Sequence, residues 1–154
     1  MIYIKLTTDK VYIESIFMNP DITNQMRDDA SKDLTGEHIM LGLEKLGGFF
    51  LKVIKDGTDA GLFWLRPLHD GFEAHTALLP SCRGKDAVKA TRMAIAWVFE
   101  HTEIPYISSY AFSDSPSVSW FCRAVGMEPV KTEPWSSTRN GKPVDITYFK
   151  INRI

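Results

Sequence analysis

The segment that most constrains the fold is a strand-like run that turns within a few residues into a long helix. Phe72–Leu79 carries apolar residues on both faces, which is typical of a strand in the middle of a sheet. Lys85–His101 then places apolar residues at helical spacing, with a basic stripe of Lys85, Lys89 and Arg92 beside them. A chain built from such units is expected to fold as a mixed α/β protein.

The remaining segments extend this pattern to one mixed sheet with helices on both faces. Apolar or alternating runs predict strands at Met1–Leu6, Phe49–Ile54, Ala60–Leu65, Tyr106–Phe112, Glu128–Trp135 and Val144–Ile151. Helical signals predict a helix from Asp9 that Asn19-Pro20 stops, and others over Ile22–Ala30, Gly36–Leu46 and from Ser115-Pro116 to Gly126. Because no repeat or linker interrupts the chain, we expect residues 1–154 to form a single domain.

Composition and cysteine usage exclude several classes of protein. A net charge of −1 argues against a protein that binds nucleic acid or an acidic membrane mainly through positive charge. The longest apolar run, Met93–Phe99, is far shorter than the ~20 residues that span a bilayer. The N-terminus carries no secretory signal, and Cys82 and Cys122 lack metal-ligand spacing. We therefore expect a cytoplasmic protein with free thiols, no metal, no nucleic acid and no membrane partner.

The loop between the central strand and the long helix is a candidate anion site. A tight turn into a helix leaves the first backbone N–H groups pointing outward, and together with the helix dipole they bind phosphate oxygens. Gly84 would let the backbone approach a ligand, while Arg83 and Lys85 supply positive charge. The alternative is a loop with a solvated Arg-Gly-Lys, and the spacing alone does not decide between the two.

Two motifs resemble those of the GNAT family of N-acetyltransferases. Pro80-x-x-Arg83-Gly84-Lys85 before an amphipathic helix is similar to that family's acetyl-CoA pyrophosphate motif. Ser115–Met127 is similar to its second motif, which usually runs Asn-Pro-x-Ala/Ser-x-x-Leu-Tyr-x-Lys-x-Gly-Phe. The element order matches along nearly the whole chain. The resemblance implies a mixed, mostly antiparallel sheet flanked by helices, acetyl-CoA as co-substrate, and an amine acceptor that attacks the thioester directly.

The resemblance also implies which positions would hold the coenzyme. They lie at the end of the central strand, in the loop, on the first helical turn and before the later helix: Leu78, Leu79, Arg83, Gly84, Lys85, Asp86, Ala87, Val88 and Ser115. A backbone N–H of Leu78 or Leu79 would polarise the thioester carbonyl. The sequence departs from the family pattern at three of these positions. Asp86 and Val88 replace glycines, and Ser115 replaces a frequent asparagine.

Three side chains are candidates for the chemistry. Glu73 and His75 alternate onto one face of the central strand, so either could be the general base. Imidazole ordinarily titrates near neutral pH, and a buried glutamate with a raised pKa would serve as well. The alternative is a hydrogen-bonded core histidine beside a strand-edge charge. Cys122 stands where the family often has a tyrosine that protonates the departing thiolate, although packing on the helix is the favoured role for a cysteine there.

A second hypothesis is a catalytically inactive GNAT-fold protein that binds a partner or serves in assembly, with or without coenzyme A. The departures from the family pattern favour it. In addition, Ala74-His75, Leu79–Lys85 and Trp97–Thr102 resemble segments of small GNAT-like proteins encoded by bacteriophages, some of which are linked with virion assembly. The acceptor, a small molecule or a protein, is not readable from the sequence, and the oligomeric state stays open, a homodimer included.

Overall fold

A computed structural model describes all 154 residues and contains seven strands and five helices. The strands are β1 (Ile2–Thr7), β2 (Phe49–Lys55), β3 (Thr58–Pro67), β4 (Phe72–Leu78), β5 (Tyr106–Phe112), β6 (Glu128–Arg139) and β7 (Lys142–Asn152). The helices are α1 (Lys10–Phe17), α2 (Pro20–Met26), α3 (Gly36–Leu46), α4 (Lys85–His101) and α5 (Pro116–Ala124). This order confirms the predicted mixed α/β class.

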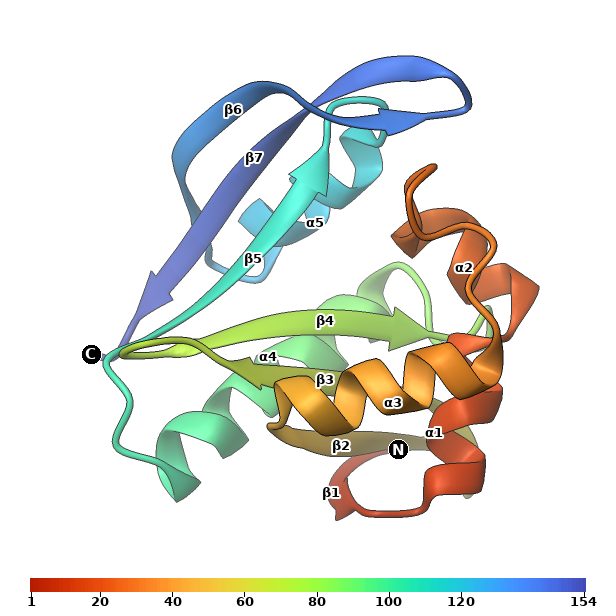
Figure 1. Ribbon diagram of the computed structural model, residues 1–154. Helices are drawn as coiled ribbons and strands as arrows, with labels where there is room; N and C mark the ends of the chain where they lie inside the picture. Colours follow the sequence, from red (N-terminus) through yellow and green to blue (C-terminus); the bar gives the residue numbers. More distant parts are fainter.

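The seven strands form one sheet in the order β1-β2-β3-β4-β5-β7-β6, with β4 at its centre as its apolar faces predict. Every neighbouring pair is antiparallel except β4 and β5, which are parallel. Helices α1 and α3 cover one face of the sheet and α4 covers the other (Figure 1). No helix is both long enough and apolar enough to cross a membrane.

The sheet is split between β4 and β5. These two strands are paired only where Phe72 meets Ile107 and Glu73 meets Ser108, and beyond that point they diverge (Figure 1). We call the space between the diverging strands the V gap. The Ser109 hydroxyl still donates to the Ala74 carbonyl at 3.2 Å, just past the last pair. The V gap therefore brings the edges of two central strands to the surface in the middle of the sheet.

The segment around Asn19-Pro20 follows the end of α1 at Phe17, as predicted, and also begins α2. The Asn19 side chain accepts from the Asp21 N–H at 2.9 Å, and Pro20 fits the first turn of α2. The prediction of Ile22–Ala30 for this helix was therefore displaced and too long. The backbone becomes extended at Arg27, whose guanidinium donates to the carbonyls of Lys32 and Leu34. These hydrogen bonds to the following loop hold the chain in an extended conformation at Arg27. The helix therefore ends at Met26, although the sequence pattern predicted it to continue to Ala30.

The β6–β7 hairpin is longer than predicted, and its tip is fastened to the loop after α2. Asn140 and Gly141 form the turn at φ values of 53° and 74°. The Asp29 carboxylate accepts from both of their N–H groups, at 2.8 and 2.9 Å. The neighbouring Asp28 carboxylate accepts from the Ser137 hydroxyl at 2.6 Å. Since α2 follows α1 on the β1–β4 side of the sheet, these bonds bridge the open end of the V gap.

Candidate functional site

The first turn of α4 carries backbone N–H groups that no side chain caps. Gly84 precedes the helix at φ 60°, in the left-handed region that glycine adopts without strain. The Val88 N–H donates to the Gly84 carbonyl at 3.2 Å, so the uncapped donors are those of the three residues between them. The Val88 side chain is partly buried against the core. The helix therefore begins where predicted and has free N–H donors in its first turn, while Val88 contributes a helical hydrogen bond and a packed side chain.

A groove of about 370 Å³ lies between this turn and α5. We call it the α4–α5 groove. Its walls come from the loop before α4, from β4, from α5 and from α2, and include Arg83, Gly84, Ala87, Thr76, Leu78, Gln25, Ser115, Ser117, Val118, Trp120 and Phe121. Arg83 is half-buried and makes only long bonds, to the carbonyls of Leu79 (3.3 Å) and Asp21 (3.4 Å). Lys85 is exposed beside it. The groove therefore combines positive charge with free N–H donors at one end.

Asp86 is held away from the groove. Its carboxylate forms an ion pair with the Lys55 ammonium at 2.8 Å, and Lys55 also donates to the Ser81 carbonyl at 2.7 Å. Asp86 does not line the α4–α5 groove. The departure from the family glycine at this position consequently adds no unpaired negative charge where phosphate oxygens would lie.

The edge of β4 that faces the V gap presents further N–H groups. The Leu79 N–H donates to the Ala60 carbonyl on β3 at 2.9 Å. Because the N–H directions alternate along an antiparallel ladder, those of Thr76 and Leu78 point away from β3 and toward the V gap. Of the two residues expected to polarise a carbonyl, Leu78 has the available N–H, whereas that of Leu79 is occupied.

Ser115 lies at the start of α5, where it is held by an arginine from β6. Its hydroxyl accepts from Arg139 Nη1 at 3.0 Å. The same Nη1 pairs with the Asp114 carboxylate at 2.6 Å, and the guanidinium also donates to the carbonyls of Asn24 and Arg27. Arg139 is 8% exposed. It therefore ties α2 and the hairpin to the entrance of the α4–α5 groove, a role that no local motif signalled.

Glu73 and His75 are brought together on β4, as their alternation predicts. His75 Nε2 lies 2.8 Å from Glu73 Oε1, and Arg66 Nη2 lies 3.3 Å from the same oxygen. Burial by itself would raise the pKa of Glu73, but the hydrogen bond and charge of His75 and the charge of Arg66 outweigh it and lower that pKa. The raised pKa that a glutamate base needs is therefore absent. With Glu73 ionised, Nε2 of His75 donates to it, and Nδ1 is the ring nitrogen that takes no part in this bond.

Aromatic rings surround His75. The Trp64 ring stacks on the imidazole with centroids 4.8 Å apart, and Tyr110 of β5 meets it edge-on at 5.7 Å. Burial, together with the charges of Glu73 and Asp28, raises the pKa of Tyr110 to about 12, so its hydroxyl stays protonated. Two clefts of about 250 and 360 Å³ share Trp64, His75 and Tyr110, and we call them the aromatic clefts. Their outer walls come from α2, α3 and β7.

Cys122 lies in the wall of the V gap. It is 3% exposed, and burial raises the pKa of its thiol to about 11, so the sulfur is not ionised at neutral pH. It borders the V gap beside Ser109, Thr76 and Phe121. This position suits the packing role and also puts a protonated thiol at the gap.

Sequence reasoning missed several residues of this site, above all Trp64, Arg66, Tyr110 and Arg139. Alternation along β5 places Tyr110 on one face of its strand, but its position beside His75 depends on where β4 and β5 separate. Trp64 and Arg66 face their partners through the β3–β4 register, which pairs Trp64 with His75 and Arg66 with Glu73. The positions of Trp64 and Arg66 could be predicted from the sequence only if the residue pairing between β3 and β4 were already known.

Solved structures with a similar fold are acetyltransferases. A spermidine N-acetyltransferase from Vibrio cholerae, in complex with CoA and spermine, superimposes with a TM-score of 0.81 at 15% identity, covering 98% of this chain and 95% of that one. A ribosomal-protein-S5-alanine acetyltransferase from Vibrio fischeri gives 0.70 at 16%, covering 98% and 92%. A GNAT-family acetyltransferase from Bacillus anthracis gives 0.74 at 15%, covering 98% and 94%. At these identities the likeness shows that the chain has the GNAT fold.

Comparison at the level of sequence gives a narrower result. A search of curated proteins found no match to this chain. A family model described as "Protein of unknown function (DUF2824)" matches residues 4–154. The match covers nearly the whole chain, including both motifs. The chain has the GNAT fold, and by this match it belongs to the DUF2824 family.

Proposed function

We propose that this protein is an acetyl-CoA-dependent N-acetyltransferase. The observation that carries the proposal is the uncapped first turn of α4, which opens onto a groove continuous with the V gap: Thr76 and Phe121 line both spaces. Helix N-termini bind phosphate oxygens through such N–H groups and the helix dipole. The pyrophosphate of coenzyme A would lie against Arg83–Ala87, with Lys85 at the rim, and Ser115 would border the other wall.

The rest of the coenzyme would extend along β4 toward His75. In that direction the N–H groups of Leu78 and Thr76 face the V gap and can donate to the thioester carbonyl. Donors fixed in a strand need little reorganisation when negative charge develops on that oxygen. The carbonyl carbon would then lie where the V gap meets the aromatic clefts.

The acceptor amine would enter through the aromatic clefts. His75 Nδ1 takes a proton from the ammonium, while the ionised Glu73 holds the imidazole through Nε2. The neutral amine attacks the carbonyl carbon, an N–C bond forms and the C–S bond breaks. The attacking nitrogen gives up its remaining extra proton, which passes to the departing sulfur, and the Cys122 thiol in the wall of the V gap would donate a hydrogen bond to that sulfur. The donor would be acetyl-CoA and the acceptor a small or protein-borne amine.

Binding and turnover can be tested separately. Acetyl-CoA at one hundred times its Kd should stabilise the folded protein by ~2.7 kcal/mol, measured as a rise in Tm. Release of free CoA thiol in the presence of a panel of primary amines then reports transfer. The absence of any thermal shift with acetyl-CoA or CoA would sink the proposal, since the groove would then not be a coenzyme site.

A second candidate is a GNAT-fold protein that binds a partner without turnover, as in an assembly role. Trp135 favours it: this residue is 79% exposed and is fixed at φ 51° within an irregular part of β6, where its N–H donates to the Asp145 carboxylate at 3.0 Å. A large aromatic ring presented to solvent on a fixed backbone is typical of an interface anchor. A protein that binds CoA but acetylates no amine would support this candidate over the first.

A further inference from the structure

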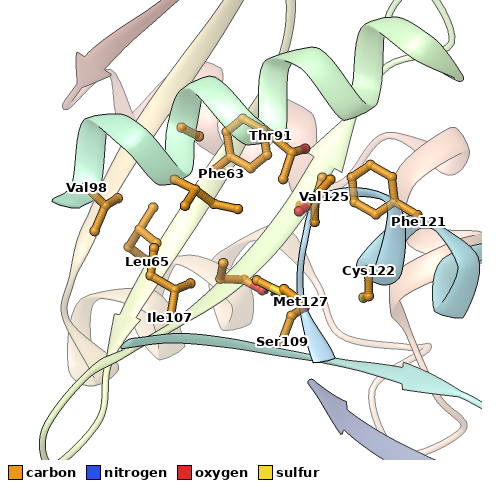
Figure 2. A pocket seen from close by; sticks show the side chains of 14 residues that line it. Phe63, Leu65, Thr91, Val98, Ile107, Ser109, Phe121, Cys122, Val125 and Met127 are labelled. Atoms are coloured by element: carbon orange, nitrogen blue, oxygen red, sulfur yellow. Dashed lines mark hydrogen bonds between the residues drawn. The ribbon is translucent and has the colours of Figure 1, made fainter. Parts of the chain in front are cut away.

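The V gap continues inward into a buried cavity. Thr76 and Phe121 line the α4–α5 groove, the V gap and this cavity, so the three spaces follow one another from the surface to the interior. The cavity lies beneath α4, at the closed end of the V gap, and is bounded by β3, β4, β5 and α5 (Figure 2). We call it the inner cavity.

The inner cavity is small and almost entirely apolar. Hydrophobic residues make up 11 of the 14 that line it, among them Phe63, Leu65, Ala94, Val98, Ile107 and Met127. Its volume of about 20 Å³ has room for roughly one group the size of a water molecule. Small side chains of α4 and β4, Ala94 and Ala74, border this space, so added carbon atoms at either position would fill it.

The V gap therefore has two inner exits of opposite character. One leads past His75 and Tyr110 into the aromatic clefts, where a charged amine can approach. The other leads past Cys122 and Ser109 into the inner cavity, on the α4 face of the sheet (Figure 2). A thioester at this junction, with its sulfur toward the α4–α5 groove and the amine on the His75 side, would have its acyl chain directed toward the inner cavity.

We infer that the inner cavity is an acyl-chain site that admits one carbon beyond acetyl, so that propionyl-CoA is a donor as well as acetyl-CoA. This inference rests on the proposed function and adds the donor specificity to it. A buried CH₂ contributes ~0.8 kcal/mol, which corresponds to about fourfold in affinity. A butyryl chain is larger than the inner cavity and has to displace packed side chains. The free-energy cost of this displacement exceeds the gain from burying the additional carbon.

One polar group borders the inner cavity without a protein partner. The Thr91 hydroxyl is buried, with the residue 5% exposed, and it makes no hydrogen bond to the protein. An unpaired hydroxyl beside a hydrocarbon chain opposes its binding, since the group stays unsatisfied. Thr91→Val keeps the shape of the side chain and makes the wall apolar, so it should raise the affinity for propionyl-CoA relative to free CoA.

Calorimetric titration with CoA, acetyl-CoA, propionyl-CoA and butyryl-CoA tests the inference on the unmodified protein. Propionyl-CoA should bind about fourfold more tightly than acetyl-CoA, and butyryl-CoA at least about tenfold more weakly than propionyl-CoA. Ala94→Val should abolish the preference for propionyl-CoA, while free CoA, which has no acyl chain, serves as the control ligand. Transfer rates to one accepted amine should follow the same order.

The outcomes separate this inference from the proposed function. If butyryl-CoA binds as tightly as propionyl-CoA, or if Ala94→Val leaves the ratio of the two shorter esters unchanged, the inner cavity does not hold the chain. The proposed function would survive either result. If neither CoA nor any of its esters binds, the proposed function fails and the acyl-chain site fails with it.

Discussion

The two sides of the V gap are built from different chemical groups. On the α4 side, the groove relies on backbone N–H groups of a helix end and a strand edge, with Arg83 and Lys85 nearby. On the α3 side, the aromatic clefts rely on side chains that come from distant parts of the chain and meet through hydrogen bonds and ring contacts, His75 and Tyr110 among them. A site made of backbone tolerates sequence change, because every residue except proline supplies an N–H group.

This difference explains why the departures at Asp86 and Val88 leave the groove intact. Asp86 turns to Lys55, and Val88 contributes a helical hydrogen bond and a partly buried side chain. The aromatic clefts should not tolerate substitutions in this way, because each side chain that is lost there removes a specific contact. Mutations on the two sides should therefore affect coenzyme binding and acceptor chemistry separately, and the following predictions test this separation.

The largest effect is expected at Arg83. Arg83→Glu places a negative charge where the pyrophosphate would lie, and the change should abolish measurable CoA binding, because a like charge at 4 Å costs on the order of 4 kcal/mol at an effective dielectric constant of 20. Calorimetry on the folded variant measures this. Arg83→Gln is the matched control and should weaken binding less, since it removes charge without reversing it. Unchanged affinity in Arg83→Glu would mean that the segment is only a loop.

The next effect concerns the acceptor side alone. In the presence of an accepted amine, His75→Ala should lower kcat by ~10²–10⁴-fold at neutral pH, the range for loss of a positioned general base. The KM for acetyl-CoA should hardly move, because in the proposed complex backbone groups away from His75 would hold the coenzyme. Glu73→Gln keeps the shape and removes the charge, so its effect on kcat should be smaller. A larger loss in Glu73→Gln than in His75→Ala would exchange the two roles.

Arg139 links both sides, so its removal should cost stability rather than one activity. Arg139→Ala leaves Asp114 and several carbonyls without a partner, and the free energy of unfolding should fall by about 3 kcal/mol. Urea denaturation measures the change. Lys142→Ala, on the same hairpin but exposed, is the control and should lie within about 0.5 kcal/mol of the wild type. Equal effects of the two substitutions would remove the special role of Arg139.

A pH-dependent effect is expected at Glu73. Because its pKa is lowered from 4.5 in the folded protein, the ionised carboxylate stabilises the fold above that value, and the contribution is lost as the pH falls through the lowered pKa. The wild type should therefore exceed Glu73→Gln in stability at pH 7 by about 1–3 kcal/mol, and the difference should narrow as the pH falls below 4.5 and through the lowered pKa. Chemical denaturation at several pH values checks this. A gap that widens in acid would contradict an ionised Glu73.

The smallest effect is a gain in stability. Thr91→Val removes a buried hydroxyl that has no partner while keeping its shape, so the free energy of unfolding should rise by about 1 kcal/mol. This corresponds to a Tm higher by about 2–4 °C for a chain of this size. Thr91→Ser, which keeps the hydroxyl and loses the methyl group, should lower the Tm instead. A lower Tm in Thr91→Val would mean that the hydroxyl is satisfied in solution.

The sequence specified the local elements well and the long-range contacts poorly. The spacing within Lys85–His101 predicted α4 to the residue, because an amphipathic stripe, a preceding glycine and the turn are all local signals. The same holds for Glu73 and His75, whose shared face follows from strand alternation. Asn19-Pro20 was correctly predicted to stop the first helix, but the start of α2 at the same residues was missed, because a capping asparagine and a first-turn proline can start a helix as well as follow one.

The contacts around Arg139 and Tyr110 depended on information that is not local. Arg139 reaches the Asn24 carbonyl, 115 positions away in the chain, and the Asp114 carboxylate, 25 positions away. No periodicity encodes such a meeting. The pKa of Glu73 is lowered first by His75 on the same strand and further by Arg66 from the neighbouring strand, and a single-strand pattern does not include the second contribution.

The short pairing of β4 with β5 has a consequence for the motions of the molecule. Strands β5, β7 and β6 with α5 form one continuous stretch of chain. Only two residue pairs and the Ser109–Ala74 hydrogen bond hold β5 to β4, and contacts of Arg139, Asp28 and Asp29 bridge the open end of the V gap. Local opening between β4 and β5 would leave the ladder from β1 to β4 closed. The width of the V gap is then an equilibrium property, and any molecule that bridges the two half-sheets would slow the exchange of amide hydrogens throughout the C-terminal half.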